Sequence, residues 1–234
     1  CLLPMSHPSE RNRPEPAASA LDLIGGTPLV RIAKITAELD PNVTVFAKLE
    51  RGNPGGSVKD RAALRMIEDA EKAGVLTRDK IILDSSSGNT GIAYAMIGAV
   101  KGYRVKIVIP ENASVERKKI MAGFGAELVF SSPFEGADGA IRMAKEILID
   151  QPARYFQPDQ YNNPSNPKAH ELTTGPEIMR ALGGQVTHFV ACVGTGGTIM
   201  GTGRALKQRD PAIRVLSVHP DDAMHGIEGT KYLE

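Results

Sequence analysis

The spacing of apolar and polar positions alternates between two patterns along this chain. From Val43 onward, short β-branched runs are followed by segments in which apolar residues recur every three or four positions. This alternation is typical of an α/β protein whose parallel strands are connected by helices. The runs predict strands at Val43–Leu49, Lys80–Leu83, Arg104–Ile109, Ala126–Phe130, His188–Cys192 and Arg214–Val218. The segments between them predict helices at Val58–Ala73, Thr90–Lys101, Ser114–Phe124, Glu135–Ile149, Glu177–Leu182 and Thr198–Gln208.

The predicted strands fall into two groups, separated by a polar, proline-spaced connector at Gln157–Pro167. Four strands precede this connector and two follow it. Because two strands are too few for an independent sheet, we expect the N-terminal segment to contribute strands to the second sheet. We also expect part of the protein to be missing from this chain.

Composition excludes several classes of partner. The chain is 41% hydrophobic and 24% charged with a formal net charge of +1, so it can bury a core and has no global field that favours nucleic acid or an anionic membrane. Cys1 and Cys192 give neither a disulfide framework nor a metal-binding pattern. No stretch has the length of a membrane span. We therefore expect a cytoplasmic protein with no metal site.

One lysine, Lys59, follows a glycine turn and stands in the first turn of a predicted helix. Ser57 is a favourable N-cap, and the apolar spacing after it gives the helix one buried face. A cation is disfavoured at this position because the exposed N–H groups and the helix dipole present positive charge. The neutral amine that Schiff-base chemistry requires is then relatively favoured. The alternative is an ordinary solvated lysine beside Asp60.

A second motif, Ser85–Gly91, lies between a predicted strand and a predicted helix. Its hydroxyls, the amide of Asn89 and the N–H groups at the helix start are gathered at the carboxyl end of a parallel strand. Such a group of donors can hold an anion such as a carboxylate. Simple helix capping explains the same residues, and both roles can coexist.

A third motif, Gly194–Thr198, again separates a strand from a helix. Glycines allow backbone N–H groups to close around an anion, so a phosphate is the expected ligand. The motif has no lysine for a nucleoside-triphosphate loop, and the last glycine of a dinucleotide fingerprint is replaced by Ile199. The pattern therefore favours a phosphate monoester, with a glycine turn that binds nothing as the alternative.

An amine suited to imine formation, a carboxylate site and a monophosphate site together describe pyridoxal 5′-phosphate and an amino acid. With these motifs the chain resembles the fold type II pyridoxal-phosphate enzymes, which are similar to the tryptophan synthase β chain, and within them the cysteine synthase and cystathionine β-synthase group. The resemblance runs in order from about Leu21 to the end. Its further segments are Gly25–Leu29, Lys48–Glu50, Gln160–Pro164 and Thr174–Glu177.

The resemblance implies two doubly wound parallel-sheet subdomains with a truncated C-terminal part. The chain would divide into a flexible leader at 1–20, a small N-terminal α/β domain at 51–162, and an incomplete large cofactor-binding domain formed by 21–50 and 163–234. The family places a Ser or Thr beside the pyridine nitrogen from a turn beyond Glu234.

The resemblance also implies roles for individual residues. Lys59 would bind the cofactor covalently and later move the Cα proton, and Asn89 would hydrogen-bond the ring hydroxyl. The residues expected to hold the cofactor phosphate are Gly194, Thr195, Gly196, Gly197 and Thr198. Those expected to bind the substrate are Ser86, Ser87, Asn89, Thr90, Gln160 and, near the substrate amine, Gly226.

The implied reaction is a β-replacement on a serine derivative, with O-acetylserine and sulfide giving cysteine and acetate as the leading pair. Three enzymatic alternatives remain: cystathionine formation from serine and homocysteine, an O-phosphoserine-dependent cysteine synthase, and a serine/threonine dehydratase. A non-catalytic scaffold is the alternative from another class. The family further implies a homodimer and a serine acetyltransferase as a partner.

Several other residues have a structural interpretation. The basic run Arg117–Lys119 is expected to form a solvated helix face, because Val115, Ile120 and Phe124 would supply the buried one. Cys192 stands in an apolar run and is expected to be a buried strand residue. Tyr94 and Met96 are expected to pack within their helix interface.

Overall fold

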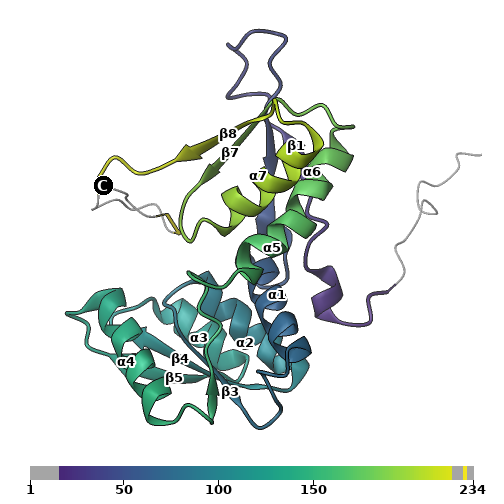
Figure 1. Cartoon of the computed structure of the whole chain (residues 1–234). Helices are drawn as coiled ribbons and strands as arrows, with labels where there is room; N and C mark the ends of the chain where they lie inside the picture. Colours follow the sequence, from purple (N-terminus) through teal and green to yellow (C-terminus); the bar gives the residue numbers. More distant parts are fainter. Residues whose placement is uncertain (1–15, 223–228, 231–234) are drawn as a thin grey trace, which may run out of the picture.

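The computed structural model describes residues 16–222 and 229–230, so the leader expected at 1–20 falls largely outside the described residues. Every predicted strand and helix is present, with bounds that differ by a few residues. Figure 1 shows two layered halves, with α1 (Lys59–Lys72) and α5 (Ser165–Leu172) between them. No helix in the described part of the chain is long and apolar enough to cross a membrane.

The first half is built on a parallel sheet with the strand order β5-β4-β3-β6. Helices cover both of its faces, so the central strands β3 and β4 are largely buried on both sides and have nearly continuous apolar sequences, whereas the edge strand β5 is partly exposed. Its strands are β3 (Ile81–Ser85), β4 (Arg104–Pro110), β5 (Glu127–Ser131) and β6 (Tyr155–Phe156). Its helices, besides α1, are α2 (Asn89–Lys101), α3 (Val115–Gly123) and α4 (Gly136–Asp150).

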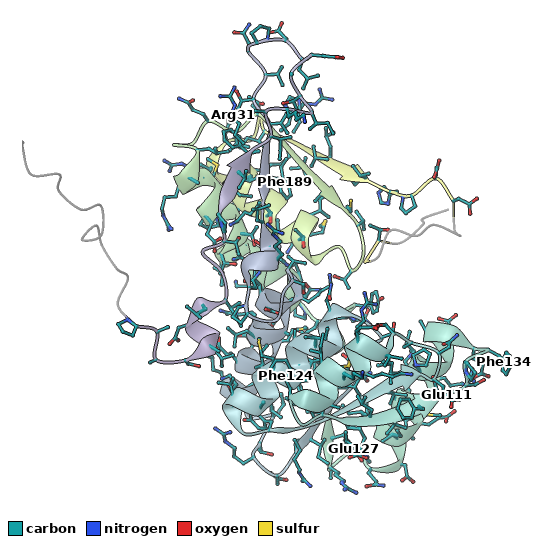
Figure 2. The ribbon with its side chains drawn as sticks, turned by 180° about the vertical axis from the view of Figure 1, so that it is seen from behind. Arg31, Glu111, Phe124, Glu127, Phe134 and Phe189 are labelled. Atoms are coloured by element: carbon teal, nitrogen blue, oxygen red, sulfur yellow. The ribbon has the colours of Figure 1, made fainter. Side chains whose placement is uncertain are left out.

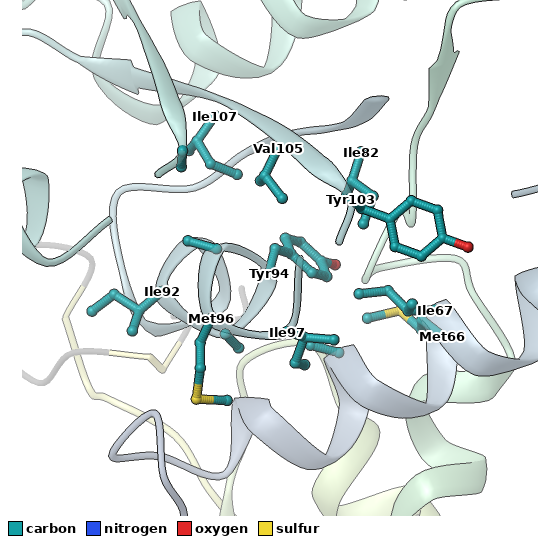
Figure 3. Close-up of a cluster of buried hydrophobic side chains, with 14 of the residues drawn as sticks. Met66, Ile67, Ile82, Ile92, Tyr94, Met96, Ile97, Tyr103, Val105 and Ile107 are labelled. Carbon is teal, nitrogen blue, oxygen red and sulfur yellow. The ribbon is translucent and has the colours of Figure 1, made fainter. Parts of the chain in front are cut away.

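Two apolar clusters hold this sheet between its helices. On one face, Met66 of α1, Tyr94 of α2 and Ile107 of β4 belong to one buried cluster, in which Tyr94 lies between the other two (Figure 3). On the other face, Ala144 of α4 packs against the cluster that contains Leu83. The helix-packing role expected for Tyr94 is confirmed, because its side chain is fully buried in the first cluster.

The second half contains two separate two-stranded sheets. Its elements are β1 (Leu29–Arg31), β2 (Phe46–Lys48), η3 (Glu50–Gly52), α6 (Thr174–Ala181), β7 (His188–Cys192), α7 (Gly197–Arg209) and β8 (Arg214–Val218). The preceding η2 (Ala20–Leu23) belongs with the first half, because Leu21 packs against the apolar cluster there. β7 and β8 are parallel, whereas β1 and β2 are antiparallel. Leu29 packs against the core formed by Ile178, Leu206 and Ile213, and in Figure 2 Arg31 and Phe189 lie in the same half. The N-terminal segment thus supplies strands, but they form their own sheet and do not extend the β7–β8 sheet as expected.

Three features differ from the sequence-based expectations. Cys192 is exposed, because inward and outward positions alternate along β7 and this residue lies on the outward side. β6 was not predicted, since two residues give no readable pattern. α5 was not predicted because Pro167 lies within it, although proline is tolerated in the first turn of a helix.

A buried group of charges joins the two halves, and we call it the Arg61 cluster: Lys48, Glu50, Arg61 and Glu177. Arg61 Nε donates to Glu50 Oε2 and Arg61 Nη1 to Glu177 Oε1, each over 2.7 Å. Lys48 Nζ lies 2.7 Å from Glu177 Oε2. Burial alone would raise the pKa of Glu177, but hydrogen bonds from Arg61 and Lys48 outweigh it and lower the pKa to about 2. The cluster therefore ties α1 to η3, β2 and α6.

We predict that Glu177→Gln lowers the free energy of unfolding at pH 7 by about 3 kcal/mol. This is the lower end of the range for removing one partner of a buried ion pair, because Glu50 still pairs with Arg61 in the variant. The Glu177 carboxylate has a pKa below its ordinary value of 4.5, so its stabilising effect is complete above pH 4.5 and is lost as the pH falls toward 2. Urea unfolding should thus show a difference from wild type that shrinks below pH 4.5. The exposed Glu38→Gln is the control, and an equal effect of both variants would contradict the prediction.

Candidate active site

A cavity of about 370 Å³ lies where β3, β4 and β7 end, with Ser85, Pro110 and Gly194 in its wall. Ligands of open α/β sheets bind beyond the carboxyl ends of the strands, and this volume is typical of small-molecule sites. The sequence-predicted site residues that line the cavity are Lys59, Ser86, Ser87, Asn89, Thr90, Gln160, Gly194 and Thr195. The structure therefore brings the lysine and parts of both anion motifs together.

Lys59 presents its amine to this cavity from the first position of α1. The amine has no hydrogen-bond or ion-pair partner in the described part of the chain, and burial lowers its pKa. A lowered pKa agrees with the sequence-based expectation, but its cause is desolvation and not the helix dipole that the sequence suggested. Ser57 was expected to be the N-cap; Val58 holds that position, and Ser57 Oγ accepts from the Lys59 N–H at 3.2 Å.

The buried Asp60 holds the glycine turn that precedes Lys59. Its Oδ2 accepts from the Gly55 N–H over 2.6 Å, and a Cβ added to Gly55 would collide with the same carboxylate. Burial raises the pKa of Asp60 to about 6, against the lowering effect of the Gly55 hydrogen bond. Asp60 thus fixes the backbone on one side of Lys59, while Ser57 bonds to the N–H of Lys59 itself.

The segment Ser85–Gly91, which we call the serine motif, combines helix capping with unused hydrogen-bonding capacity. Ser86 Oγ accepts from the N–H groups of Gly88 and Gly91 at 3.3 and 3.0 Å. A hydroxyl that accepts two bonds still has a proton to donate, so capping leaves Ser86 able to bind an anion. The buried Thr90 donates to Gln160 Oε1 over 2.8 Å and connects the motif to the connector.

Only part of the segment Gly194–Thr198, which we call the glycine motif, lies in the cavity wall. Gly196 has a φ of +80°, which favours glycine, and serves as the N-cap of α7. It borders a second hollow, between α7 and β8. Gly197 packs so closely against Asn166 that a Cβ would overlap that side chain, and Thr198 Oγ1 lies 3.4 Å from His170 Nε2. Within the described wall of the cavity, Gly194 and Thr195 are the members of this motif.

Gly226, expected near the substrate amine, lies outside the described residues. Gly229 and Thr230, slightly further along the chain, line the cavity. A Cβ on Gly194 would overlap the Gly229 carbonyl oxygen, so the two backbones are in close contact there. The C-terminal segment therefore contributes to this wall of the cavity.

Asn166 and Arg117 are among the residues at the site that sequence reasoning missed. Asn166 Nδ2 donates to the Gln160 carbonyl and to Thr195 Oγ1, at 2.8 and 2.9 Å, and so joins the connector to the glycine motif. Arg117 was expected on a solvated face but lines the cavity, because the first turn of α3 starts close to the end of β4. That position, just after a strand in a parallel sheet, is the signal that could have identified Arg117.

We predict that the Lys59 amine titrates below the ordinary lysine value of 10.5, because its charged form is desolvated. Competitive labelling with an amine reagent over a pH series, read by peptide mass spectrometry, gives a midpoint for each lysine. The midpoint of Lys59 should lie below the ordinary lysine value. A midpoint at or above that value would show that burial does not depress the pKa of this amine.

Comparison with known proteins adds an independent line of information. The protein family described as "Pyridoxal-phosphate dependent enzyme" matches residues 20–231. A cysteine synthase of Aquifex aeolicus (strain VF5) is 53% identical over 215 residues, which cover 92% of this chain and 66% of the relative. The chain thus spans slightly less than two thirds of the length of this curated relative.

Solved structures of related enzymes are also similar to this chain. The crystal structure of a cysteine synthase from Entamoeba histolytica superposes with a TM-score of 0.89 at 37% identity, over 98% of this chain and 70% of that one. An O-acetylserine dependent cystathionine β-synthase from Helicobacter pylori superposes with a TM-score of 0.82 at 38% identity, over 93% of this chain and 70% of that one. At these identities the similarity extends beyond general architecture.

Proposed function

This chain belongs to the family of pyridoxal-phosphate-dependent enzymes, and from that premise we propose that the protein is a cysteine synthase, which converts O-acetylserine and sulfide into cysteine and acetate. The observation that carries the proposal is the Lys59 amine, which has no partner in the described structure and lines a cavity together with residues of two anion motifs. Two of the three relatives named above are cysteine synthases, which supports the choice of reaction.

The residues of the cavity fit the cofactor. Burial lowers the pKa of the Lys59 amine, which favours the neutral form that reacts with an aldehyde. Gly194 offers a backbone N–H and Thr195 a hydroxyl for a phosphate, and Gly194 has no room for a side chain. When bound, pyridoxal 5′-phosphate supplies an electron sink that acidifies the Cα proton of an amino acid.

In this proposal the protein side chains bind, orient and move protons. Ser86 and Asn89 would donate to the substrate carboxylate, with Gln160 held beside them by its hydrogen bond with Thr90. Asn89 would also donate to the ring hydroxyl of the cofactor. Lys59 would hold the cofactor and move the proton at Cα. Gly196, Gly197 and Thr198 remain proposed phosphate residues through the start of α7.

A second candidate function uses an organic thiol in place of sulfide. The similarity to a structure named as an O-acetylserine dependent cystathionine β-synthase favours it, because that protein shares this fold at 38% identity. Homocysteine would then add where sulfide adds in the first proposal.

The proposal extends to assembly and location. We expect a homodimer, a serine acetyltransferase as a partner, and residence in the cytoplasm, as the family resemblance implies. Size-exclusion chromatography with light scattering, with and without an added serine acetyltransferase, tests the first two. A monomeric mass under all conditions would contradict them.

We predict that Lys59→Ala lowers the rate of cysteine formation by about 10³-fold or more, because the variant loses both the cofactor amine and the proton carrier. The protein is supplied with pyridoxal 5′-phosphate and O-acetylserine, and with either sulfide or homocysteine, and products are identified by mass spectrometry. Lys119→Ala is the matched lysine control and should leave the rate unchanged.

Cofactor uptake is followed in parallel by visible absorbance, so that a loss of binding is distinguished from a loss of chemistry. Release of a 2-oxo acid alone would refute the replacement reaction. Formation of cystathionine but no cysteine would favour the second candidate.

A further inference from the structure

His170 is a buried histidine beside the glycine motif that the proposed function does not use. It stands in the last turn of α5 and is 2% exposed. Its Nδ1 lies 2.9 Å from Thr174 Oγ1 of α6, and its Nε2 lies 3.4 Å from Thr198 Oγ1 of α7. One imidazole thus lies between two hydroxyls, and one of these hydroxyls belongs to the glycine motif.

Two glycines of α7 allow α5 to approach this closely. A Cβ on Gly201 would crowd the Cβ of His170. A Cβ on Gly197 would overlap the side chain of Asn166. Because these glycines are four residues apart, they share the face of α7 that contacts α5. A side chain at either position would move the helices apart and separate His170 from Thr198.

The imidazole of His170 is neutral at pH 7. Burial and the nearby charge of Arg61 lower the pKa of His170 to about 4, although Glu50 acts in the opposite direction. A neutral imidazole has one N–H and one free nitrogen lone pair. It therefore donates to one of its two hydroxyl partners and accepts from the other, and its tautomer decides which.

The tautomer also decides how Thr198 can interact with a phosphate. If Nε2 carries the proton, it donates to Thr198 Oγ1, and the proton of the hydroxyl stays free for a phosphate oxygen. If Nδ1 carries the proton, Thr198 donates to Nε2 and presents only lone pairs to the phosphate. Because acceptors that face each other repel, a phosphate at the start of α7 selects the first arrangement.

Thr195 shows the same arrangement with a donor that has no tautomers. Its Oγ1 accepts from Asn166 Nδ2 at 2.9 Å and from the Gly197 N–H at 3.4 Å. The proton of this hydroxyl is thus free for a ligand. Asn166 and His170 are four residues apart in α5, so one face of this helix contacts both hydroxyls of the glycine motif.

We propose that His170 is a positioning residue for the cofactor phosphate: its Nε2–H donates to Thr198 and leaves the proton of that hydroxyl directed at the phosphate. Thr174 completes the arrangement, because its hydroxyl donates to Nδ1 and so stabilises the tautomer with the proton on Nε2. The inference rests on the proposed function, since it assumes that pyridoxal 5′-phosphate places its phosphate at the start of α7.

The first test separates binding of the phosphate from binding of the pyridine ring. Protein freed of cofactor is titrated with pyridoxal 5′-phosphate and with pyridoxal, which lacks the phosphate, and binding is followed by visible absorbance. His170→Leu should weaken binding of pyridoxal 5′-phosphate by about tenfold, the order expected for loss of a hydrogen bond to a charged group. The affinity for pyridoxal should not change.

Two further variants control this titration. His170→Gln keeps an N–H donor near the position of Nε2 and should retain most of the affinity for pyridoxal 5′-phosphate. His188→Leu removes an exposed histidine and should change neither affinity. Thermal unfolding establishes that each variant is folded. An equal loss for both ligands in His170→Leu would indicate a general packing role and would overturn the inference, as would no loss for either.

The second test reads the tautomer in the wild-type protein, so it also applies where His170→Leu does not fold. Nitrogen-15 NMR of histidine-labelled protein distinguishes a protonated ring nitrogen from a free one. The signals of His170 are identified by their loss in His170→Gln. In the protein loaded with pyridoxal 5′-phosphate, the proton should lie on Nε2. A proton on Nδ1 would refute the proposed role.

The inference and the proposed function fail in different ways. If the wild-type protein takes up no pyridoxal 5′-phosphate, the proposed function fails. The tautomer is then read in the presence of inorganic phosphate, where a proton on Nδ1 still refutes the inference. If the protein binds the cofactor and forms cysteine, but His170→Leu weakens pyridoxal 5′-phosphate and pyridoxal equally, the inference about His170 alone is refuted.

Discussion

The position of Lys59 depends on the buried guanidinium of Arg61, two residues further along α1. Its side chain is 1% exposed, and its carboxylate partners Glu50 and Glu177 come from segments that are far apart in the chain. A buried charge is tolerated only when it is paired and hydrogen-bonded, so α1, η3 and α6 must meet in one arrangement. This arrangement directs the start of α1, and with it the amine of Lys59, into the cavity.

The same principle of paired polar groups shapes the rest of the site. The bond from Thr90 to Gln160 and the bonds from Asn166 to Gln160 and Thr195 connect the serine motif, the connector and the glycine motif. Because these side chains are already held in place, ligand binding loses little free energy in ordering them. The cavity is thus formed by tertiary contacts between several segments, and no one of these segments forms it alone.

The sequence predicted most of this organisation because its signals are local. Buried strands, capped helices and glycine turns all have short-range patterns, so the elements and the residues Lys59, Ser86 and Asn89 could be named in advance. The two-residue β6 and the proline-containing α5 lack such patterns. Arg117 shows a second limit, since its place in the cavity follows from where α3 begins relative to the sheet and not from its neighbours in sequence.

The separate sheets of the second half illustrate the same limit. The need for more strands beside β7 and β8 could be deduced from strand number, but the pairing of β1 with β2 depends on hydrogen-bond register. Likewise, the exposure of Cys192 follows from which side of β7 faces α7. Periodicity states that two sides exist and does not state which elements cover them.

We propose that this fold holds the Lys59 amine in position for covalent binding of pyridoxal 5′-phosphate. Borohydride reduction of the loaded protein, followed by proteolysis and peptide mass spectrometry, identifies the lysine that bears the cofactor. We predict a reduced pyridoxyl group on Lys59, with none on Lys48, which is paired with Glu177. An adduct on another lysine with Lys59 unmodified would contradict the claim.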